Sequence, residues 1–394
     1  MRGRCARVEV GALGRDGWRN LRGYGMVFSG GCGGGVDVVW GVAQPSWVWD
    51  GFQRLMRHHG SVLVAALVVV GLLGAAPASG ADTVVGELLR PSVIRDYGGV
   101  QVFSDFDGSA YRLAVRRDGR VERLAVAGSR APFDVDIGPD RNGRPQLIYT
   151  RCKVERPVVD LGTNISSGCD LVVFSLAGGG AERPVRNANT AGGDEFAPTL
   201  WKGRIAFARK VKGGGRALVY TRQLAAPRSR PSLRLPGAPG RTSSRGILEL
   251  DLRGAKLAQI VRFARSAEVR LVDIADRSVR TVSRVGVGEG GQFFAGIGFS
   301  GAHLGWALNC LISCEPLSAG IYRYRLSTRK LVRASPPLQL GGAVIGLALF
   351  APDGAYVIDG EPQDGGCGGS LDPLPRRCRM IRSQPLPFNR AAAR

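Results

Sequence analysis

The chain has 394 residues, with 54 Lys and Arg against 32 Asp and Glu, which gives a formal net charge of +22. This length allows two or three domains or one large all-β domain. The basic residues are mostly Arg and form no dense run and no basic helix with interleaved aromatic residues, so we expect no nucleic-acid partner. We attribute the charge to Arg spread over solvated loops; binding to an anionic polymer of the cell envelope is the alternative.

A signal peptide is predicted at residues 56–81. Met56 begins a short basic segment, and an apolar run of about 15 residues follows within Ser61–Ala78 and ends in small residues. A membrane anchor needs about 20 apolar residues, so we expect only a transient contact with the membrane during export. Cleavage after Ala76-Pro77-Ala78 would place the mature start at Ser79, and cleavage after Ser79-Gly80-Ala81 would place it at Asp82.

Residues 1–55 precede this signal and are rich in Gly, Arg and Trp. A signal peptide begins at its basic segment, so we interpret Met56 as the true start and residues 1–55 as the product of a wrongly assigned upstream start. A disordered cytoplasmic extension is the alternative. Either way, we leave this segment out of the fold prediction.

From Asp82 onward the sequence consists of short strands and turns without a helical period. Glycine followed by an apolar run recurs six times at intervals of about fifty residues, the length of one propeller blade. The clearest copy is the turn Pro352-Asp353-Gly354, and a second hairpin follows each first one. The glycines that begin the six copies are Gly98, Gly143, Gly203, Gly254, Gly301 and Gly354.

The repeats predict an all-β fold: a single six-bladed β-propeller of four-stranded antiparallel blades at residues 82–394. A β-sandwich of this length would need two domains and a linker. The Pro- and Arg-rich stretch 227–245 falls inside the repeat phase, so we interpret it as a loop between the third and fourth blades. The six blades are expected near 95–128, 132–186, 194–235, 245–284, 291–334 and 343–388.

Two segments resemble the repeat of TolB-like (WD-repeat-like) β-propellers. They are Asp194–Phe207, with its acidic start and Ile-Ala-Phe strand, and Phe350–Gly354, with its Ala-Pro-Asp-Gly turn. The resemblance covers about residues 95–388, and the other turns match it less well. It implies a secreted or periplasmic propeller that binds proteins or envelope components, and it carries over no catalytic residue because the shared motif is structural.

Six of the eight cysteines follow the signal and form three pairs close in sequence. In an exported chain they are expected to form disulfides. Zinc is not expected, because His303 is the only histidine after residue 59. Each pair lies between the second and third strands of a blade, although six cysteines allow fifteen connectivities. The predicted disulfides are Cys152–Cys169, Cys310–Cys314 and Cys367–Cys378.

Other chemistry is weakly indicated. Asp-rich turns such as Asp134-Val135-Asp136 lack the ligand spacing of a calcium loop, and no Gly-x-Ser-x-Gly elbow accompanies His303, so we expect no metal, cofactor or catalytic triad. Acidic residues near the inner ends of blades are the candidates for ligand binding. These candidates are Asp194, Glu195, Asp359 and Glu361.

The sequence therefore predicts an exported, monomeric, non-catalytic propeller that binds or scaffolds a protein or another component of the cell envelope. One alternative is a propeller hydrolase or lyase with carboxylates in its channel. A tight cluster of two or three carboxylates at the channel mouth would favour it, whereas a mixed or apolar rim would favour binding. The other alternative, a binder of an anionic envelope polymer, would need the Arg residues gathered on one side.

Overall fold

The computed structural model of the chain falls into two units, Met1–Pro77 and Ala78–Arg394. In the first unit, β1 (Ser29–Gly30) pairs antiparallel with β2 (Val36–Asp37). The rest of the expected extension and all but the last residue of the expected signal peptide lie outside the described residues. The residues described are 29–30, 36–37, 81–90, 92–154, 166–177, 180–211, 217–227, 229–237, 246–286, 292–310, 320–334, 344–350, 354–360, 378–384 and 388–389.

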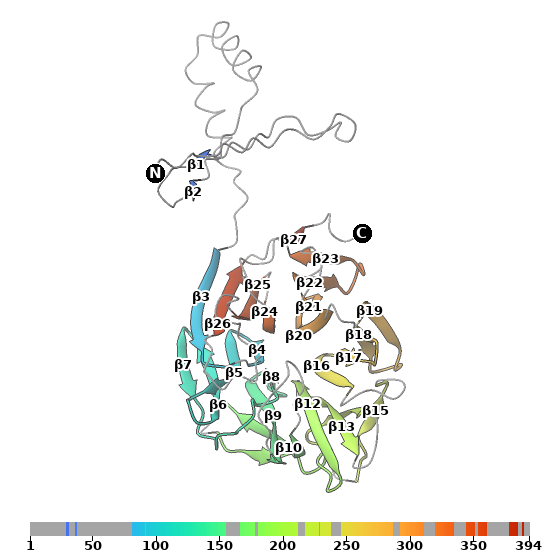
Figure 1. The fold of residues 1–394 in the computed structure, drawn as a ribbon. Coiled ribbons are helices and arrows are strands. Elements are labelled where there is room, and N and C mark those ends of the chain that lie inside the picture. The colour runs from blue at the N-terminus through green and yellow to red at the C-terminus, as the bar shows by residue number, and fades with distance from the viewer. Residues whose placement is uncertain are drawn as a thin grey trace, which may run out of the picture. The chain divides into compact units, whose positions relative to one another are not determined.

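The described part of the second unit forms six antiparallel sheets that follow one another around a ring (Figure 1). The first sheet contains β4 (Ile94–Tyr97), β5 (Val100–Phe106), β6 (Tyr111–Arg117) and β7 (Arg120–Arg123). The second contains β8 (Val135–Pro139), β9 (Pro145–Val154), β10 (Ser167–Ser175) and β11 (Arg183–Pro184). The third contains β12 (Gly193–Trp201), β13 (Arg204–Val211), β14 (Ala217–Gln223) and β15 (Leu233–Leu235).

The remaining three sheets complete the ring. The fourth contains β16 (Ile247–Arg253), β17 (Lys256–Arg262), β18 (Ser266–Asp273) and β19 (Val279–Gly286). The fifth contains β20 (Gln292–Ser300), β21 (His303–Cys310), β22 (Gly320–Arg325) and β23 (Leu331–Ala334), and β27 (Phe388–Asn389) is added at its edge. The sixth contains β24 (Val344–Phe350), β25 (Gly354–Gly360), β26 (Cys378–Gln384) and β3 (Ala81–Leu88). The expected six-bladed propeller is confirmed.

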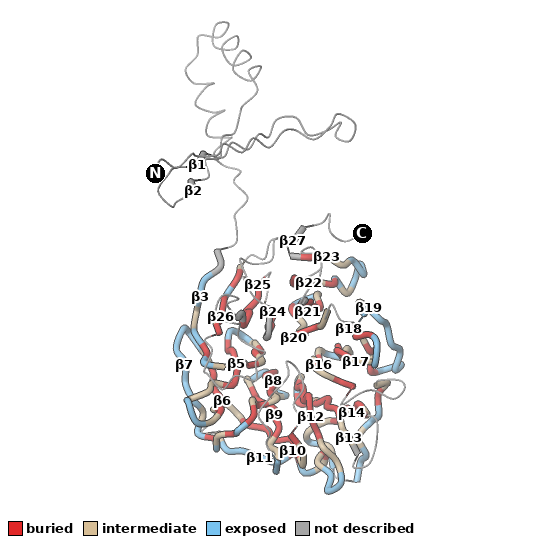
Figure 2. The backbone as a smooth tube through the Cα atoms, viewed as in Figure 1, coloured by how far each residue is buried: buried red, intermediate tan, exposed pale blue. Residues whose placement is uncertain are grey.

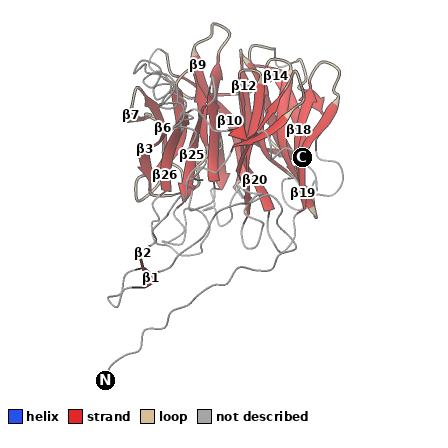
Figure 3. Cartoon of the chain, turned by 90° about the horizontal axis from the view of Figure 1, so that it is seen from above, coloured by secondary structure: helices blue, strands red, loops and turns tan. Residues whose placement is uncertain are grey.

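Figure 3 shows the blades edge-on, with only strands and loops in the described part of the chain. The recurrent glycines make the expected tight turns between the first and second strands. Gly143 and Gly203, for example, have φ angles of 81° and 71°, in the left-handed region that glycine adopts at little cost. Across the described residues, no helix has the length and apolar character needed to cross a membrane.

The last blade is closed by the strand that comes first in the second unit. β3 pairs antiparallel with β26, from Ala81 opposite Gln384 to Leu88 opposite Cys378, and Figure 1 shows the blue strand beside the red one. The first strand of the unit and β26, near its carboxyl end, are therefore held in one sheet. The predicted blades begin near residue 95 and do not include this strand, because a partner at the far end of the chain leaves no local pattern.

The hydrophobic core lies between neighbouring blades. Phe196, Val219 and Leu235 of the third blade pack with Leu250 and Leu257 of the fourth, and all five side chains are almost completely buried. Figure 2 shows the same trend around the ring, with buried inner strands and exposed outer strands such as β7 and β19. A blade cannot bury both faces alone, so packing between neighbours stabilises the whole ring.

Candidate functional site: a cavity at the end of the central channel

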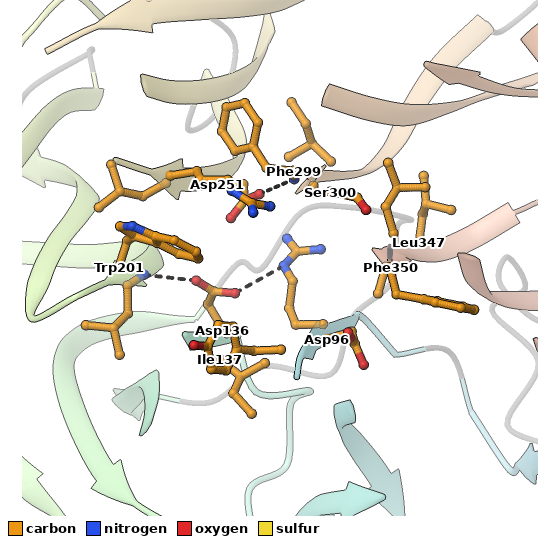
Figure 4. Close-up of a pocket in the computed structure, with 18 of the residues that line it drawn as sticks. Asp96, Asp136, Ile137, Trp201, Asp251, Phe299, Ser300, Leu347 and Phe350 are labelled. Atoms are coloured by element: carbon orange, nitrogen blue, oxygen red, sulfur yellow. Dashed lines mark hydrogen bonds and ion pairs between the residues drawn. The ribbon is translucent and has the colours of Figure 1, made fainter. Parts of the chain in front are cut away.

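The six innermost strands, β4, β8, β12, β16, β20 and β24, surround a cavity of about 220 Å³, shown in Figure 4. We call it the channel-end cavity. It is lined near the carboxyl ends of these strands, from Gly98 after β4 to Gly301 after β20. The Cys152–Cys169 disulfide lies beyond the amino-terminal end of β8, because Val135 at the start of β8 pairs with Tyr149, three residues before Cys152. The cavity and the disulfide are thus at opposite ends of the blade.

Arg95 of β4 lies among the acidic residues of the channel. Its guanidinium donates to Glu249 Oε2 at 3.0 Å, and its Nε lies 3.9 Å from Asp136 Oδ1. The Arg95 and Asp136 side chains are only 10% and 5% exposed, so this is a buried ion network. Burial lowers the pKa of Arg95, but Glu249, Asp136 and Asp251 outweigh it and raise the pKa, so the guanidinium stays charged.

The acid of β8 links the second blade to the third. Asp136 Oδ2 accepts hydrogen bonds from Thr199 Oγ1 at 2.7 Å and from the backbone N–H of Leu200 at 2.9 Å. Thr199 Oγ1 in turn accepts from the backbone N–H of Leu252 in the fourth blade at 2.9 Å. These side chains satisfy inner-strand N–H groups that have no partner in their own sheet, so they stabilise the contact between blades.

The acids of β16 link the fourth blade to the fifth in the same way. The two oxygens of Glu249 accept from the backbone N–H groups of Gly296 and Ile297, each at 3.0 Å, and Asp251 Oδ2 accepts from Phe299 N at 2.5 Å. Gly296 has a φ angle of 63° and lies at an irregularity in the pairing of β20 with β21, which frees these N–H groups from the sheet.

Burial changes the protonation of the channel acids. Burial is the main cause that raises the pKa of Asp136. Burial, followed by repulsion from Asp136, raises the pKa of Asp251 to about 7. Burial also raises the pKa of Asp96, next to Arg95, to about 6. The cavity therefore holds carboxyl groups that titrate near neutral pH.

Aromatic side chains form much of the rim of the cavity. The rings of Tyr97 and Trp201 meet edge to face with centroids 6.0 Å apart, and the guanidinium of Arg253 lies 5.0 Å above the Trp201 ring. Phe299 and Phe350 line the cavity from the fifth and sixth blades, and both are half-buried. The rim is thus a mixture of aromatic and charged groups.

The structure places two of the four predicted ligand-binding acids at the start of β12, outside the lining of the channel-end cavity. Asp194 Oδ1 accepts from the backbone N–H groups of Gly168 and Cys169. Glu195 is fully buried and accepts from Arg209 Nε at 2.7 Å. Asp359 lies in β25, but its side chain and all of Glu361 are outside the described part of the chain.

Four acids of the channel, Asp96, Asp136, Glu249 and Asp251, were not among the predicted ligand-binding residues. The signal that could have revealed Asp136 and Asp251 is a pair of acids two residues apart at the start of an inner strand or within it, as in Asp134-Val135-Asp136 and Glu249-Leu250-Asp251. Alternate residues of a strand share a face, so both acids of each pair face the same way. In the first pair, Asp134 also links blades, since its Oδ2 accepts from Ala197 N at 2.6 Å.

One of the predicted disulfides is confirmed, because Cys152 and Cys169 are bonded with their Cα atoms 3.9 Å apart. They are directly opposite each other in the pairing of β9 with β10, the second and third strands of the blade. Cys378 is also disulfide-bonded. Cys314, Cys367 and the side chain of Cys310 lie outside the described part of the chain, so the other two pairings stay predictions.

The turn interpretation of the Asp-rich segments holds for Asp140 but is wrong for Asp134-Val135-Asp136, because Asp134 directly precedes β8, Asp136 lies in it, and both accept from the backbone of the third blade. Asp140 Oδ1 accepts from the backbone N–H groups of Asn142 and Arg144 at 2.8 and 2.9 Å. His303 begins β21 opposite Ser300, and burial together with Arg323 and Arg325 lowers its pKa. Among the side chains that the structure describes, no three His, Cys, Asp or Glu residues are grouped to hold a metal ion.

No protein-family model and no curated protein matches the sequence. Solved structures with similar folds include TolB from Acinetobacter baumannii, at 13% identity over 77% of this chain and 65% of that one with a TM-score of 0.42. They also include a putative TolB from Agrobacterium tumefaciens, at 13% identity over 50% of this chain and 65% of that one with a TM-score of 0.35. Trypanosoma rangeli sialidase in complex with the inhibitor DANA matches at 12% identity over 75% of this chain and 54% of that one, with a TM-score of 0.47.

These matches include the TolB propellers that the sequence resembles, and the chain spans 65% of the length of each TolB structure. The expected TolB-like resemblance is confirmed at the level of the fold, a six-bladed propeller of antiparallel blades. At these identities and TM-scores, the matches carry no argument about activity, substrate or partner.

Proposed function

We propose that the chain is an exported propeller that binds a protein or another envelope component, and that the rim of the channel-end cavity is its recognition surface. The observation that carries this proposal is the mixed lining of the cavity. Tyr97, Trp201, Phe299 and Phe350 supply aromatic surface beside Arg253 and the buried acids. Aromatic residues and Arg dominate the energetics of protein interfaces, and rigid blades hold them in place.

The bonding of the channel acids supports a binding role over a catalytic one. Asp136, Glu249 and Asp251 each accept hydrogen bonds from the backbone of the next blade. Removing any of them would leave buried N–H groups without a partner, so these carboxylates have a structural role that explains their presence without catalysis.

The proposed export is supported by the confirmed disulfide. A bond between Cys152 and Cys169 is typical of proteins that fold in an oxidising compartment, such as the periplasm or the cell exterior. The basic segment and apolar run after Met56 supply the matching export signal. We therefore propose a location in the periplasm or outside the cell.

The binding role can be tested by capture from an extract of the native cell envelope. Trp201→Ala removes the rim aromatic that contacts both Tyr97 and Arg253, whereas Tyr220→Ala removes a half-buried aromatic that stacks on Phe207 within the same blade. We expect a partner that is captured by the wild type and by Tyr220→Ala but lost with Trp201→Ala. A partner retained equally by all three proteins would place recognition elsewhere.

One observation favours a hydrolase as a second candidate. Asp136 and Asp251 are buried near each other, and burial raises the pKa of Asp251 to about 7, a value suited to a general acid. Wild-type protein and Asp251→Asn should be compared on a panel of chromogenic glycosides and esters. Turnover that is lost in the variant would select the hydrolase; absence of turnover together with Trp201-dependent capture would select the binding module.

A further inference from the structure

The size of the channel-end cavity limits what it can hold. Its volume is about 220 Å³. Sites for drug-sized ligands and cofactors usually measure about 300–1,000 Å³, so this cavity suits a side chain or a small organic group and is too small for a nucleotide. A ligand of this cavity is therefore either a small free molecule or a side chain or terminal group of a larger partner.

Hydrogen-bond acceptors dominate the polar lining. Asp136 and Asp251 each use Oδ2 for a short bond to the next blade. The other oxygen of each has a longer contact: Asp136 Oδ1 lies 3.9 Å from Arg95 Nε, and Asp251 Oδ1 lies 3.5 Å from Thr199 Oγ1. The backbone N–H groups of Ile137 and Leu252 also bond to Asp136 and Asp251, respectively. A carboxylate accepts at about four lone-pair sites, so each acid can still accept a bond from a ligand.

Ser300 gives an independent indication of a ligand. It is only 9% exposed, it lines the cavity at the end of β20, and its Oγ has no hydrogen-bond partner among the described residues. Figure 4 shows it beside Phe299 and across from Phe350. A buried hydroxyl without a partner is uncommon in a native structure, and a polar group bound in the cavity would satisfy it.

The charged residues that line the cavity indicate which kind of hydrogen-bond donor a ligand would present. Asp96, Asp136 and Asp251 line the cavity together with two cations, Arg95 and Arg253. Both cations are already engaged: Arg95 bonds to Glu249 at 3.0 Å, and Arg253 lies over the Trp201 ring. A further cation near Asp136 and Asp251 would be attracted by both and would offset their mutual repulsion, whereas an anion would be repelled by both. Binding of a carboxylate or phosphate is therefore disfavoured.

The aromatic rim is compatible with a cation. Arg253 already lies over the Trp201 ring at 5.0 Å, which shows that this rim can stabilise positive charge through its ring faces. The half-buried rings of Tyr97 and Trp201 supply apolar surface for a short alkyl stem. An acceptor-rich, negatively charged base below an aromatic rim fits a compact cation on an apolar stem.

We propose that the channel-end cavity binds an alkylammonium group, in which the charged nitrogen donates to the Asp136 and Asp251 carboxylates and to Ser300 and the carbon stem packs against the aromatic rim. An ammonium has three N–H donors and no acceptor, which matches this acceptor-rich lining. The group can come from a lysine side chain, a chain N-terminus or a free small amine. The inference deepens the proposed binding function and rests on it.

Calorimetric titration of the full chain tests this assignment. The probes are n-butylammonium, Nα-acetyl-lysine-N-methylamide and triglycine with a free N-terminus, with 1-butanol and butyrate as neutral and anionic controls of the same length. We expect at least one of the three amines to bind about tenfold more tightly than 1-butanol, the effect of one charge-assisted hydrogen bond. Which amine binds best identifies the source of the group.

Two substitutions assign the binding to this cavity. Asp251→Asn removes the charge but keeps a carbonyl that can accept from Phe299 N, and Ser300→Ala removes only the unpartnered hydroxyl. We expect amine affinity to fall about tenfold in the first and severalfold in the second. Glu122→Gln, an exposed acid on β7, is the matched control and should bind like the wild type.

Amines that bind no better than 1-butanol, tighter binding of butyrate, or unchanged amine affinity in both Asp251→Asn and Ser300→Ala would overturn the proposal. Since Ser300→Ala removes no bond within the described residues, it tests the site even if Asp251→Asn disturbs folding. Trp201-dependent capture of a partner without amine binding would overturn this inference alone and leave the proposed binding function standing.

Discussion

Asp136 in the second blade accepts a hydrogen bond of 2.9 Å from the backbone N–H of Leu200 in the third. Two residues further along β8, a Cβ atom on Gly138 would lie 2.0 Å from the carbonyl oxygen of the same Leu200. The two blades therefore touch through backbone at the channel. The Asp136 side chain bonds the two blades together, and the absence of a side chain at Gly138 allows their backbones to lie close to each other.

This close approach predicts that Gly138→Ala is strongly destabilising. The new methyl would overlap a backbone oxygen that cannot move without separating the blades, so we expect a loss of about 3 kcal/mol in the free energy of unfolding. Gly192→Ala is the control, since its Cβ would meet nothing within 4 Å. Urea unfolding measures both. Equal midpoints for the two variants would contradict the contact.

The raised pKa of Asp251 predicts a stability that depends on pH. The pKa rises from the ordinary value of 3.8 to about 7 in the folded chain, because of burial and the neighbouring Asp136. Between about pH 4 and about pH 7 the folded state holds more protons than the unfolded state, so the free energy of unfolding falls as pH rises through this window. Arg95 and Glu249 also face this group, and Asp96 titrates in the same direction.

Asp251→Asn removes this titration. We expect the decrease in stability between about pH 4 and about pH 7 to become shallower, by up to about 1.4 kcal/mol per pH unit. A residual slope remains from Asp96, Asp136 and Glu195, whose pKa values are also raised by burial. Denaturant titrations at several pH values in this window provide the measurement. A variant as steep as the wild type would show that Asp251 does not carry the shifted proton.

Closure of the ring by β3 predicts that the strand is essential for stability. Deleting residues 1–77 leaves Ala78–Arg394, the whole propeller unit, and should not change its thermal midpoint. Deleting residues 1–88 also removes β3, which exposes the edge of β26 and the buried Leu88 site. We expect a lower thermal midpoint and a tendency to aggregate, because an open sheet edge pairs with other chains. Identical midpoints would rule out the closing role of β3.

The confirmed disulfide predicts a loss of stability when it is removed. Cys152 and Cys169 are separated by 17 residues, and the chain-entropy model gives about 3 kcal/mol for closing a loop of this length. The double change Cys152→Ser with Cys169→Ser should lower the free energy of unfolding by that order. Chemical unfolding of both proteins under oxidising conditions provides the comparison, and the bonded Cys378 is present in both.

N-terminal analysis of the native protein tests the predicted export signal. Starts at Ser79 and Asp82 both preserve most of β3, whose pairs run from Ala81 to Leu88. We therefore expect a mature N-terminus at one of these two residues and no peptide from residues 1–55. A peptide from that segment in the native protein would contradict the interpretation of Met56 as the start.

The sequence by itself determined the architecture of this protein. Glycine turns at regular intervals and alternating apolar strands specify blades locally, so the repeat and the four-stranded unit could be predicted without a structure. The Cys152–Cys169 pair was also accessible, because its cysteines are close in sequence and flank a single hairpin. These features depend on neighbours along the chain.

Only the tertiary structure decided the closing strand and the channel-end cavity. β3 finds its partner at the far end of the chain, and the cavity combines Arg95, Asp136, Asp251 and Ser300 from four different blades. Asp194 and Asp136 are both acids near an inner strand, and the spacing of acids around Asp136 does not by itself show which of the two reaches the cavity. Their roles depend on which blade lies beside them and on how deeply each is buried, and both are set by closure of the ring.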